Sequence, residues 1–267
     1  MCIAVFEWRA HPLYPFLMFL NRDEYHDRPT KALGRWEEDG EIVGGRDCVA
    51  GGTWLGCTKG KIAFLTNVRE KELNLSSSQS KSRGELPLRF LKSNKSPHDF
   101  AEELMGEADL FGGFNLVVVD LCSMIVLYMT NRPKGRGGVL VTEVSPGIHV
   151  LTNATLDSPW PKSQRLQKKF KLVLDEYSES EIPVESVAKE LMIDTTKDAE
   201  LPGVYSPELE FHLSSIFVEA YRSKGVCYGT RSTSALAVDN CSEVKFYERS
   251  LMNGGSWEER TMSFKAV

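Results

Sequence analysis

The second residue of the chain is a cysteine, and removal of Met1 would make it the first. Methionine aminopeptidase acts before small residues, so the sequence permits this removal. The free α-amine of Cys2 would then be a base of near-neutral pKa beside a thiol, and the two together could attack an acyl carbonyl. A cysteine at this position is by itself more often incidental, so the hypothesis depends on the residues that accompany it.

Polar residues that could assist such a nucleophile follow or interrupt apolar runs at three later points. In the segment NRDE (21–24), Arg22 could lower the pKa of a nearby thiol, and the carboxylate of Asp23 could hold or orient the α-ammonium. The amide of Asn153 could donate to a developing oxyanion, and Arg231 could bind a substrate carboxylate or stabilise that charge. Taken singly, each has a simpler interpretation as a surface ion pair or a turn residue.

The N-terminal elements would position the first of these groups. Residues 1–8 and 13–20 are two β-rich runs joined by a short turn, which predicts a hairpin. Both runs are too continuously apolar for one face to be solvated, so we expect the hairpin inside a sheet. A second hairpin is expected at 54–57 and 61–67, with Lys59-Gly60 at its turn. Gly51-Gly52 before it should form a tight turn with a positive φ at a glycine.

The remaining chain alternates between sheet and helix patterns. Residues 73–83 are rich in Ser, Lys and Gln and predict a mobile surface loop. Proline after a capping serine marks two helix starts, at Ser96-Pro97 and Ser158-Pro159. The expected helices cover 84–91, 96–105, 158–177 and 184–192; the expected strands are four between 114 and 153, then 216–221, 226–238, 243–249 and 257–264. Without a repeat or a long linker, residues 1–267 are expected to form a single domain.

Composition excludes several classes of function. The chain has 32 Lys and Arg against 37 Asp and Glu, a net charge of -5, which disfavours nucleic-acid binding. Its six cysteines form no CxxC pair and no finger-like spacing with the five histidines, so no metal site and no covalent haem attachment are predicted. The apolar run 13–20 contains Pro15 and is far too short to span a membrane. We therefore expect a soluble cytoplasmic protein with reduced thiols.

Several ordered motifs extend along nearly the whole chain: MCIAVF at 1–6, NRDE at 21–24 with Arg28-Pro29, GGTWLG at 51–56, LTN at 65–67, GGFNL at 112–116, LTNATLDSPWPK at 151–162, YGTRS at 228–232 and FYERS at 246–250. Together they resemble the Transport and Golgi organisation 2 family. That family is similar in turn to N-terminal-nucleophile hydrolases of the penicillin V acylase and bile-salt hydrolase branch. The resemblance implies an α+β fold, a four-layer α-β-β-α sandwich of two antiparallel sheets.

The resemblance also implies roles for individual residues. Cys2, Arg22, Asp23, Asn153 and Arg231 match the hydrolases' nucleophile, early Arg and Asp, later Asn and later Arg. One departure concerns Arg22 and Asp23, which are adjacent here but separated by intervening residues in the hydrolases. A regular strand would direct adjacent side chains to opposite faces unless a bulge or turn begins there.

Two functions from different classes follow. The first is hydrolysis of an amide or acyl bond of a small-molecule substrate, with no cofactor required. The second is a non-catalytic carrier of haem or a lipid-type ligand in the same pocket, because the resemblance implies roles in haem mobilisation, mitochondrial lipid metabolism, Golgi organisation and secretion. The resemblance therefore adds the mitochondrion and the Golgi to the cytoplasm as locations. A trafficking adaptor ranks last, since no amphipathic or polybasic segment supports it. The sequence indicates no oligomeric state.

Overall fold

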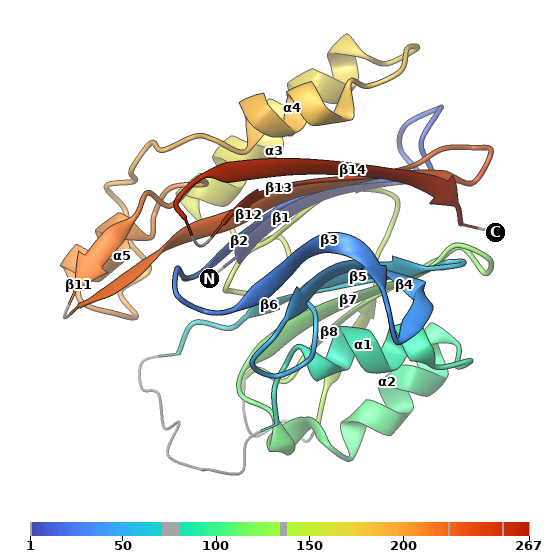
Figure 1. Ribbon diagram of the computed structural model, residues 1–267, viewed down its shortest axis with the longest axis horizontal. Coiled ribbons are helices and arrows are strands. Elements are labelled where there is room, and N and C mark those ends of the chain that lie inside the picture. Colours follow the sequence, from blue (N-terminus) through green and yellow to red (C-terminus); the bar gives the residue numbers. More distant parts are fainter. Residues whose placement is uncertain (1, 71–80, 134–137, 224, 253, 267) are drawn as a thin grey trace. The chain divides into compact units, whose positions relative to one another are not determined.

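The computed structural model describes residues 2–70, 81–133, 138–223, 225–252 and 254–266. It contains two antiparallel seven-stranded sheets, each with α-helices on one face (Figure 1). Residue contacts divide the chain into two compact units. The first comprises Met1–Arg28, Pro146–Thr152 and Leu156–Lys265, and the second comprises Pro29–Ser145, Asn153–Thr155 and Ala266–Val267. The predicted α+β class with two antiparallel sheets is confirmed.

The sheet of the first unit joins strands from both ends of the sequence. Its order is β10 (Gly147–Leu151), β1 (Cys2–Trp8), β2 (Phe16–Tyr25), β12 (Val226–Val238), β13 (Glu243–Leu251) and β14 (Trp257–Lys265), with β11 (Tyr221–Ser223) paired to β12. The hairpin of β1 and β2 is internal, because β10 flanks β1 and β12 flanks β2. Every residue of β1 is buried, so the expectation that this hairpin lies inside a sheet is confirmed.

Helices α3 (Pro161–Glu176) and α4 (Val184–Leu191) cover one face of this sheet. The core between them includes Ile3 and Phe19 from the sheet and Phe170 from α3, whose ring meets that of Phe19 edge-on at 5.6 Å. The short helix α5 (Pro207–His212) follows α4 and was not predicted from the sequence.

The predicted start of α3 at Ser158-Pro159 is wrong. The helix begins at Pro161, and its N-cap residue Trp160 is extended, with φ -67° and ψ 143°. A residue that precedes proline is disfavoured in the helical region, so Trp160 cannot be helical here and the second proline sets the boundary.

The second unit is an antiparallel meander in chain order. Its strands are β3 (Thr30–Trp36), β4 (Asp39–Asp47), β5 (Leu55–Thr58), β6 (Lys61–Asn67), β7 (Phe114–Asp120), β8 (Ile125–Thr130) and β9 (Leu140–Glu143). Helices α1 (Glu85–Lys92) and α2 (Pro97–Met105) pack on it, followed by the 3-10 turn Ala108–Leu110. The Ser96 side chain accepts a hydrogen bond from the backbone N–H of Asp99, which confirms the predicted cap of α2.

Glycines make the two expected turns of the second unit. Gly51 has φ +76° and Gly60 has φ +74°, which confirms the turn before β5 and the turn between β5 and β6. The predicted loop 73–83 falls mostly on residues 71–80, which lie outside the described residues. Lys81, just after them, forms an isolated bridge with Phe111.

Two other expectations fail for different reasons. Strands β3 and β4 were not predicted, because lysines, arginines and glycines interrupt their alternation. The predicted strand 216–221 is instead irregular up to residue 220, although Ile216 and Val218 are buried, and β11 begins only at Tyr221. Its backbone is hydrogen-bonded to side chains: Asn21 donates to the Ile216 carbonyl, and the Val218 N–H donates to the Thr230 hydroxyl. Backbone bonds are also present, since the N–H of Phe217 donates to Asp194 and the Val218 carbonyl accepts from Thr230, but they do not form a regular ladder.

Candidate functional site

Cys2 lies directly opposite Arg22 where β1 begins and β2 approaches its end. Directly opposed residues of an antiparallel pair project to the same face of the sheet, so the thiol and the guanidinium share one face. Both side chains are buried, with residue exposures of 7% and 5%. The candidate nucleophile is therefore next to a cation, as the sequence hypothesis requires.

Asp23 belongs to the opposite face of the same strand. It pairs with Thr230 of β12, whose hydroxyl donates to the Asp23 carboxylate at 2.7 Å. The same hydroxyl accepts the N–H of Val218 at 2.8 Å, which fixes its orientation. The sequence argument that adjacent Arg22 and Asp23 diverge is correct for this strand. The irregularity in the ladder lies instead in β12, between Thr230 and Ser232.

Arg231 occupies that irregularity, and its guanidinium binds backbone. It donates to the carbonyls of Tyr25 at 3.2 Å, Arg28 at 2.6 Å and Leu251 at 3.1 Å. The side chain is buried, and burial together with the nearby charge of Arg22 lowers the Arg231 pKa from its usual value. In this arrangement Arg231 holds the segment after β2 against the end of β13.

Asn153, the fifth predicted residue, belongs to the second unit, whereas the other four belong to the first. Its amide nitrogen donates to the Asn67 carbonyl at 2.7 Å, and its own carbonyl accepts the N–H of Arg69 at 2.8 Å. The side-chain oxygen is buried without a hydrogen-bond partner within the described part of the chain. The convergence of Asn153 with Cys2 stays a prediction.

The NRDE segment uses each of its four side chains differently. Asn21 donates to the carbonyls of Met192 at 2.7 Å and Ile216 at 3.0 Å, which ties the connections around α4 to the sheet. Arg22 forms a 3.6 Å ion pair with Glu24 on its own face. The side chains of Asn21 and Asp23 thus lie on the helix-covered face of the sheet. Those of Arg22 and Glu24 lie on the face that carries Cys2.

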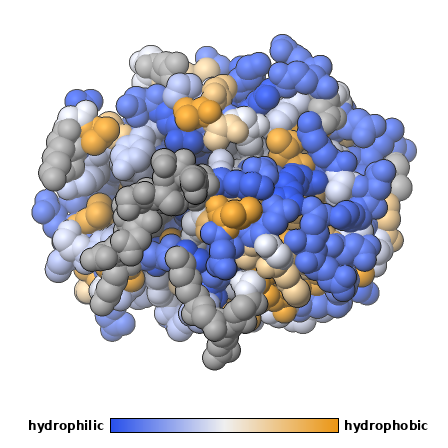
Figure 2. Space-filling model, turned by 90° about the horizontal axis from the view of Figure 1, so that it is seen from below, coloured by the Kyte–Doolittle hydropathy of each residue, from blue (hydrophilic) through white to orange (hydrophobic). Residues whose placement is uncertain are grey.

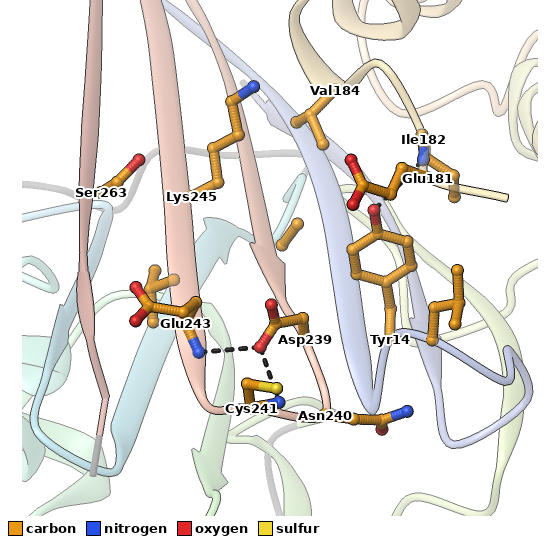
Figure 3. A pocket seen from close by; sticks show the side chains of 13 residues that line it. Tyr14, Glu181, Ile182, Val184, Asp239, Asn240, Cys241, Glu243, Lys245 and Ser263 are labelled. Carbon is orange, nitrogen blue, oxygen red and sulfur yellow. Dashed lines mark hydrogen bonds between the residues drawn. The ribbon is translucent and has the colours of Figure 1, made fainter.

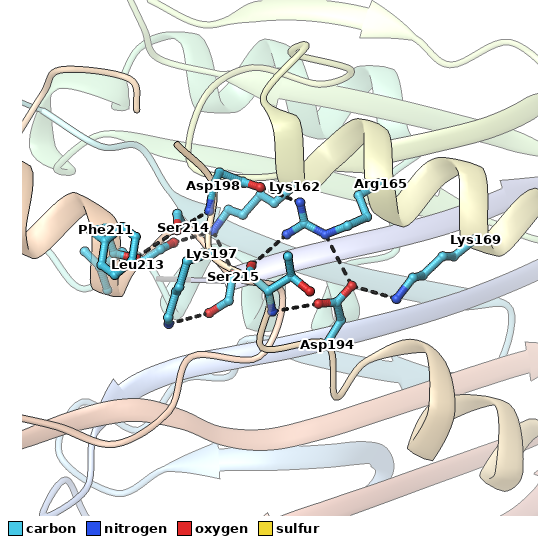
Figure 4. A network of polar contacts seen from close by, with 11 residues as sticks. Lys162, Arg165, Lys169, Asp194, Lys197, Asp198, Phe211, Leu213, Ser214 and Ser215 are labelled. Atoms are coloured by element: carbon cyan, nitrogen blue, oxygen red, sulfur yellow. Dashed lines mark hydrogen bonds and ion pairs between the residues drawn. The ribbon is translucent and has the colours of Figure 1, made fainter. Parts of the chain in front are cut away.

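Lys162 is a buried charge near Asp23 that the sequence analysis did not single out. Its residue exposure is 2%, and its ammonium donates to the carbonyls of Leu213 at 2.9 Å and Ser215 at 3.5 Å (Figure 4). Burial raises the pKa of Asp23, while the Lys162 charge and the Thr230 hydrogen bond act in the opposite direction. A carboxylate held between these influences is sensitive to any change in its neighbours.

A signal for Lys162 was present in the sequence. The buried positions of α3 recur with helical spacing, and a lysine occupies the first of them: Lys162, Ser163, Leu166, Phe170 and Leu174. A cation at a core position of an amphipathic helix needs a buried polar partner. The motif LTNATLDSPWPK also ends on this lysine.

Burial keeps the Cys2 thiol in its neutral form. The loss of solvent raises its pKa above the usual value, and the nearby carboxylate of Asp23 adds to that effect. Arg22 and a hydrogen bond from the Asp23 backbone lower the pKa but do not cancel the rise. The thiol would therefore need a proton acceptor at the moment of attack, the part that the sequence hypothesis gives to the α-amine. Met1 lies outside the described residues.

A pocket of about 380 Å³ lies at the other end of the β1–β2 hairpin, away from Cys2 (Figure 3). Tyr14 and Ile182 line one side, where the tyrosine oxygen accepts the Ile182 N–H at 3.1 Å. Asp239 and Cys241, in the turn between β12 and β13, line another. None of the five predicted catalytic residues lines this pocket.

Over the described residues, no group of three or more His, Cys, Asp or Glu side chains could hold a metal ion. Nor does any helix in these ranges have the length and apolarity to cross a membrane. On the face shown in Figure 2, hydrophobic residues are separated by hydrophilic ones.

Comparison with known proteins identifies relatives along the whole chain. The model of the Transport and Golgi organisation 2 family matches residues 1–253. The Homo sapiens Transport and Golgi organization protein 2 homolog is 33% identical over 286 residues, covering 99% of each chain. The Bos taurus homolog is 32% identical with the same coverage, and the Drosophila melanogaster protein is 23% identical over 97% of this chain and 96% of its own.

Among the solved structures that are similar to the chain is a Caenorhabditis elegans ortholog of N-acylethanolamine-hydrolyzing acid amidase, with a TM-score of 0.41 and 13% identity, over 88% of this chain and 92% of that chain. A likeness at this level supports no inference about activity.

Proposed function

The chain belongs to the Transport and Golgi organisation 2 family, and from its N-terminal geometry we propose that it is an N-terminal-nucleophile-like hydrolase of amide or other acyl bonds. Cys2 is the nucleophile in this proposal. The observation that carries it is the register of β1 on β2, which sets Cys2 opposite Arg22 with Asp23 as the next residue. An N-terminal thiol, a guanidinium and a carboxylate are thereby held at one strand end by an internal ladder.

The proposed reaction begins once Met1 has been removed. The α-amine of Cys2 takes the thiol proton, and the sulfur adds to the substrate carbonyl carbon. The carbon–nitrogen bond then breaks, and the α-ammonium returns its proton to the leaving amine. Water hydrolyses the resulting thioester, which frees the thiol and releases the acid.

The other predicted residues have supporting parts in this reaction. Arg22 stabilises negative charge on the sulfur or on a substrate carboxylate. Asp23 accepts a hydrogen bond from the α-ammonium, and Lys162 favours the ionised form of that carboxylate. Donation from the Asn153 amide to the oxyanion stays a prediction from the sequence, because Asn153 belongs to the second unit. Arg231 acts as a positioning residue, because its guanidinium is used on three backbone carbonyls.

The alternative is a non-catalytic carrier of haem or a lipid-type ligand at the same place. One observation favours it: burial raises the pKa of the Cys2 thiol, so the group resembles a packed cysteine more than an activated nucleophile. In this reading the buried cations would bind the acidic group of a ligand, and no acyl intermediate would form.

The deciding experiment combines intact mass with turnover. Protein with its native N-terminus is weighed to establish whether Met1 is absent, then assayed on amide, ester and thioester libraries. Cys2→Ser should lower turnover by about a hundredfold or more with little change in stability, because the two side chains are nearly isosteric. Cys122→Ser, at an exposed thiol, is the matched control. Retention of Met1, or no turnover by the wild-type protein with ligand binding unchanged in Cys2→Ser, supports the carrier.

The cellular setting forms part of the same proposal. The names of the relatives connect them with transport and Golgi organisation. We extend that role to this chain, acting from the cytoplasm on a small-molecule substrate at the Golgi or the mitochondrion. Fractionation of cells that express the tagged protein tests the location.

A further inference from the structure

A second cysteine, Cys227, lies beside a histidine, His26, just beyond the Tyr25–Tyr228 pair that ends the β2–β12 ladder. His26 follows β2, and its backbone N–H donates to the Cys227 carbonyl at 2.8 Å. The Cys227 sulfur and the Nδ1 of His26 are 3.4 Å apart, within reach of a hydrogen bond that involves sulfur. A thiol and an imidazole in contact are the pair of groups from which nucleophilic cysteines are built.

A cation completes the cluster on the other side of Cys227. Arg222 of β11 is directly opposite Cys227 in the β11–β12 pair, so the two side chains project to the same face. Cys227 thus has an imidazole at its sulfur and an arginine at the opposed position of the neighbouring strand. An arginine so placed can stabilise the negative charge that develops on sulfur during attack.

The surroundings of His26 keep its imidazole neutral. Burial lowers the His26 pKa, and the charges of Arg231 and Arg222 lower it further, against a smaller opposing effect of Asp27. Its Nε2 is buried without a hydrogen-bond partner among the described residues. A neutral imidazole can take a proton at neutral pH, which an imidazolium cannot.

The other partly accessible cysteines have different surroundings. Cys48, Cys122 and Cys241 are exposed, so each is more accessible than Cys227, which is half-buried. Within the described ranges, none of these three exposed thiols is hydrogen-bonded to a histidine; the Cys48 sulfur instead lies 3.9 Å from the Arg46 carbonyl. They provide internal standards for the reactivity of exposed thiols that contact no histidine in these ranges, and Cys122 has in addition the charge of Lys61 nearby.

We propose that Cys227 is a second nucleophilic thiol, separate from Cys2, that forms covalent adducts with electrophilic alkenes such as α,β-unsaturated carbonyl compounds. His26 takes the thiol proton as the sulfur adds to the β-carbon. The electrons of the carbon–carbon π bond move to the α-carbon, which receives the proton from His26. The product is a thioether, and neither a leaving group nor an oxidant is needed.

The test measures the rate of addition at each cysteine with N-ethylmaleimide as the alkene. Full-length protein is labelled for short times at pH 7 and digested, and the adduct at each site is quantified by mass spectrometry. Cys227 should react about tenfold faster than Cys122 and Cys241, because the gain of roughly a hundredfold from a positioned base exceeds the loss from its lower exposure. Its rate should level off near neutral pH, where neutral His26 is the proton acceptor, whereas the rates of the two exposed cysteines should continue to rise with pH.

Two variants separate the base from the cation. His26→Gln should lower the Cys227 rate by roughly a hundredfold and remove the early plateau, because the proton acceptor is lost. Arg222→Gln should keep the plateau and lower the rate a few-fold. His98→Gln, at an exposed histidine that lies beside Glu143, should change nothing. Buried Cys57 belongs to the second unit and reports the folding of that unit, so thermal unfolding of each variant is measured to show that the first unit is folded.

The proposal is overturned if Cys227 reacts no faster than the exposed cysteines in the wild-type protein. It is equally overturned if His26→Gln, with the thermal unfolding of the wild-type protein, leaves the Cys227 rate and pH profile unchanged. Since Cys2 plays no part in this reaction, Cys2→Ser should leave the Cys227 rate as it is.

Discussion

Burial shifts the pKa of several ionisable side chains of the first unit away from the value that each would have in water. Glu7 is an example outside the candidate site. It is fully buried on β1, where one carboxylate oxygen accepts the backbone N–H groups of Ala10 and His11 and the other has no partner among the described residues. Burial, opposed by these two hydrogen bonds, raises its pKa from 4.5 to about 7.

The shift at Glu7 predicts a pH-dependent stability. A carboxyl whose folded pKa is raised binds its proton more tightly in the native state, so its contribution is complete below pH 4.5 and is lost as pH rises to about 7. Glu7→Gln cannot ionise and should be more stable than the wild-type protein at pH 8, by about 2 to 3 kcal/mol. Urea unfolding at pH 4.5 and pH 8 measures the difference, with exposed Glu37→Gln as the control. A difference independent of pH would contradict the prediction.

Lys162 allows a second prediction on single residues. Lys162→Met should lose about 2 kcal/mol of stability, because the carbonyls of Leu213 and Ser215 would be left without their charged donor. Lys169 is the matched control on the same helix: it is 44% exposed and pairs with Asp194, so Lys169→Met should cost less than about 1 kcal/mol. Equal losses for the two variants in urea unfolding would show that burial of Lys162 does not matter.

At the scale of elements, glycines allow a loop and a helix to approach closely in the second unit. Gly52 precedes β5, and Gly84 is the N-cap residue of α1. A Cβ on Gly52 would lie 2.3 Å from the carbonyl carbon of Gly84, a backbone atom that cannot rotate away. The sequence indicated the turn at Gly51-Gly52, but the reason for the second glycine is this contact with α1.

The two neighbouring glycines should therefore respond differently to alanine. At Gly51 a Cβ would meet no atom within 4 Å, so Gly51→Ala should lose only the stability that a positive φ costs alanine, about 1 kcal/mol. Gly52→Ala must displace α1 or the loop and should lose about 2 to 4 kcal/mol. Gly40→Ala, where neither a close atom nor a positive φ is present, controls for the change of residue. Thermal unfolding of the three variants gives the order, and an effect of Gly51→Ala as large as that of Gly52→Ala would contradict it.

At the scale of the whole molecule, the first unit closes the chain by joining N-terminal and C-terminal strands in one sheet. Strands β1 and β2 pair in one sheet with β12 and β13, although about two hundred residues separate them in sequence. Arg231 reinforces the closure, because its guanidinium joins the segment after β2 to the end of β13. The sheet of the second unit is built from strands that follow one another in the chain.

Hydrogen exchange should reveal this closure. The amides of β1 and β12 should lose protection from exchange at the same denaturant concentration, because strands of one sheet unfold cooperatively. Arg231→Lys, which cannot make the three forked contacts, should weaken protection in β2 and β13 and leave β6 and β7 unchanged. A loss of protection in β12 that is not accompanied by one in β1 would contradict the cooperativity.

The sequence alone determined features that depend on neighbouring residues. The internal β1–β2 hairpin, the positive φ of Gly51 and the Ser96 cap of α2 all follow from residue type and local order. Strand alternation also indicated that adjacent Arg22 and Asp23 would diverge, since side-chain direction in a strand has a period of two. Family membership was visible because ordered motifs extend over the whole length.

Only the tertiary structure decided what those residues contact. The guanidinium of Arg231 binds carbonyls of Tyr25, Arg28 and Leu251, and the irregular segment at Ile216 is hydrogen-bonded to Asn21. The contact between Cys227 and His26 likewise joins residues 201 positions apart. The physical reason is that backbone carbonyls and N–H groups occur at every position, so residue type cannot identify the one that a buried side chain will bind. That choice is made by chain packing, which brings distant segments to one strand end.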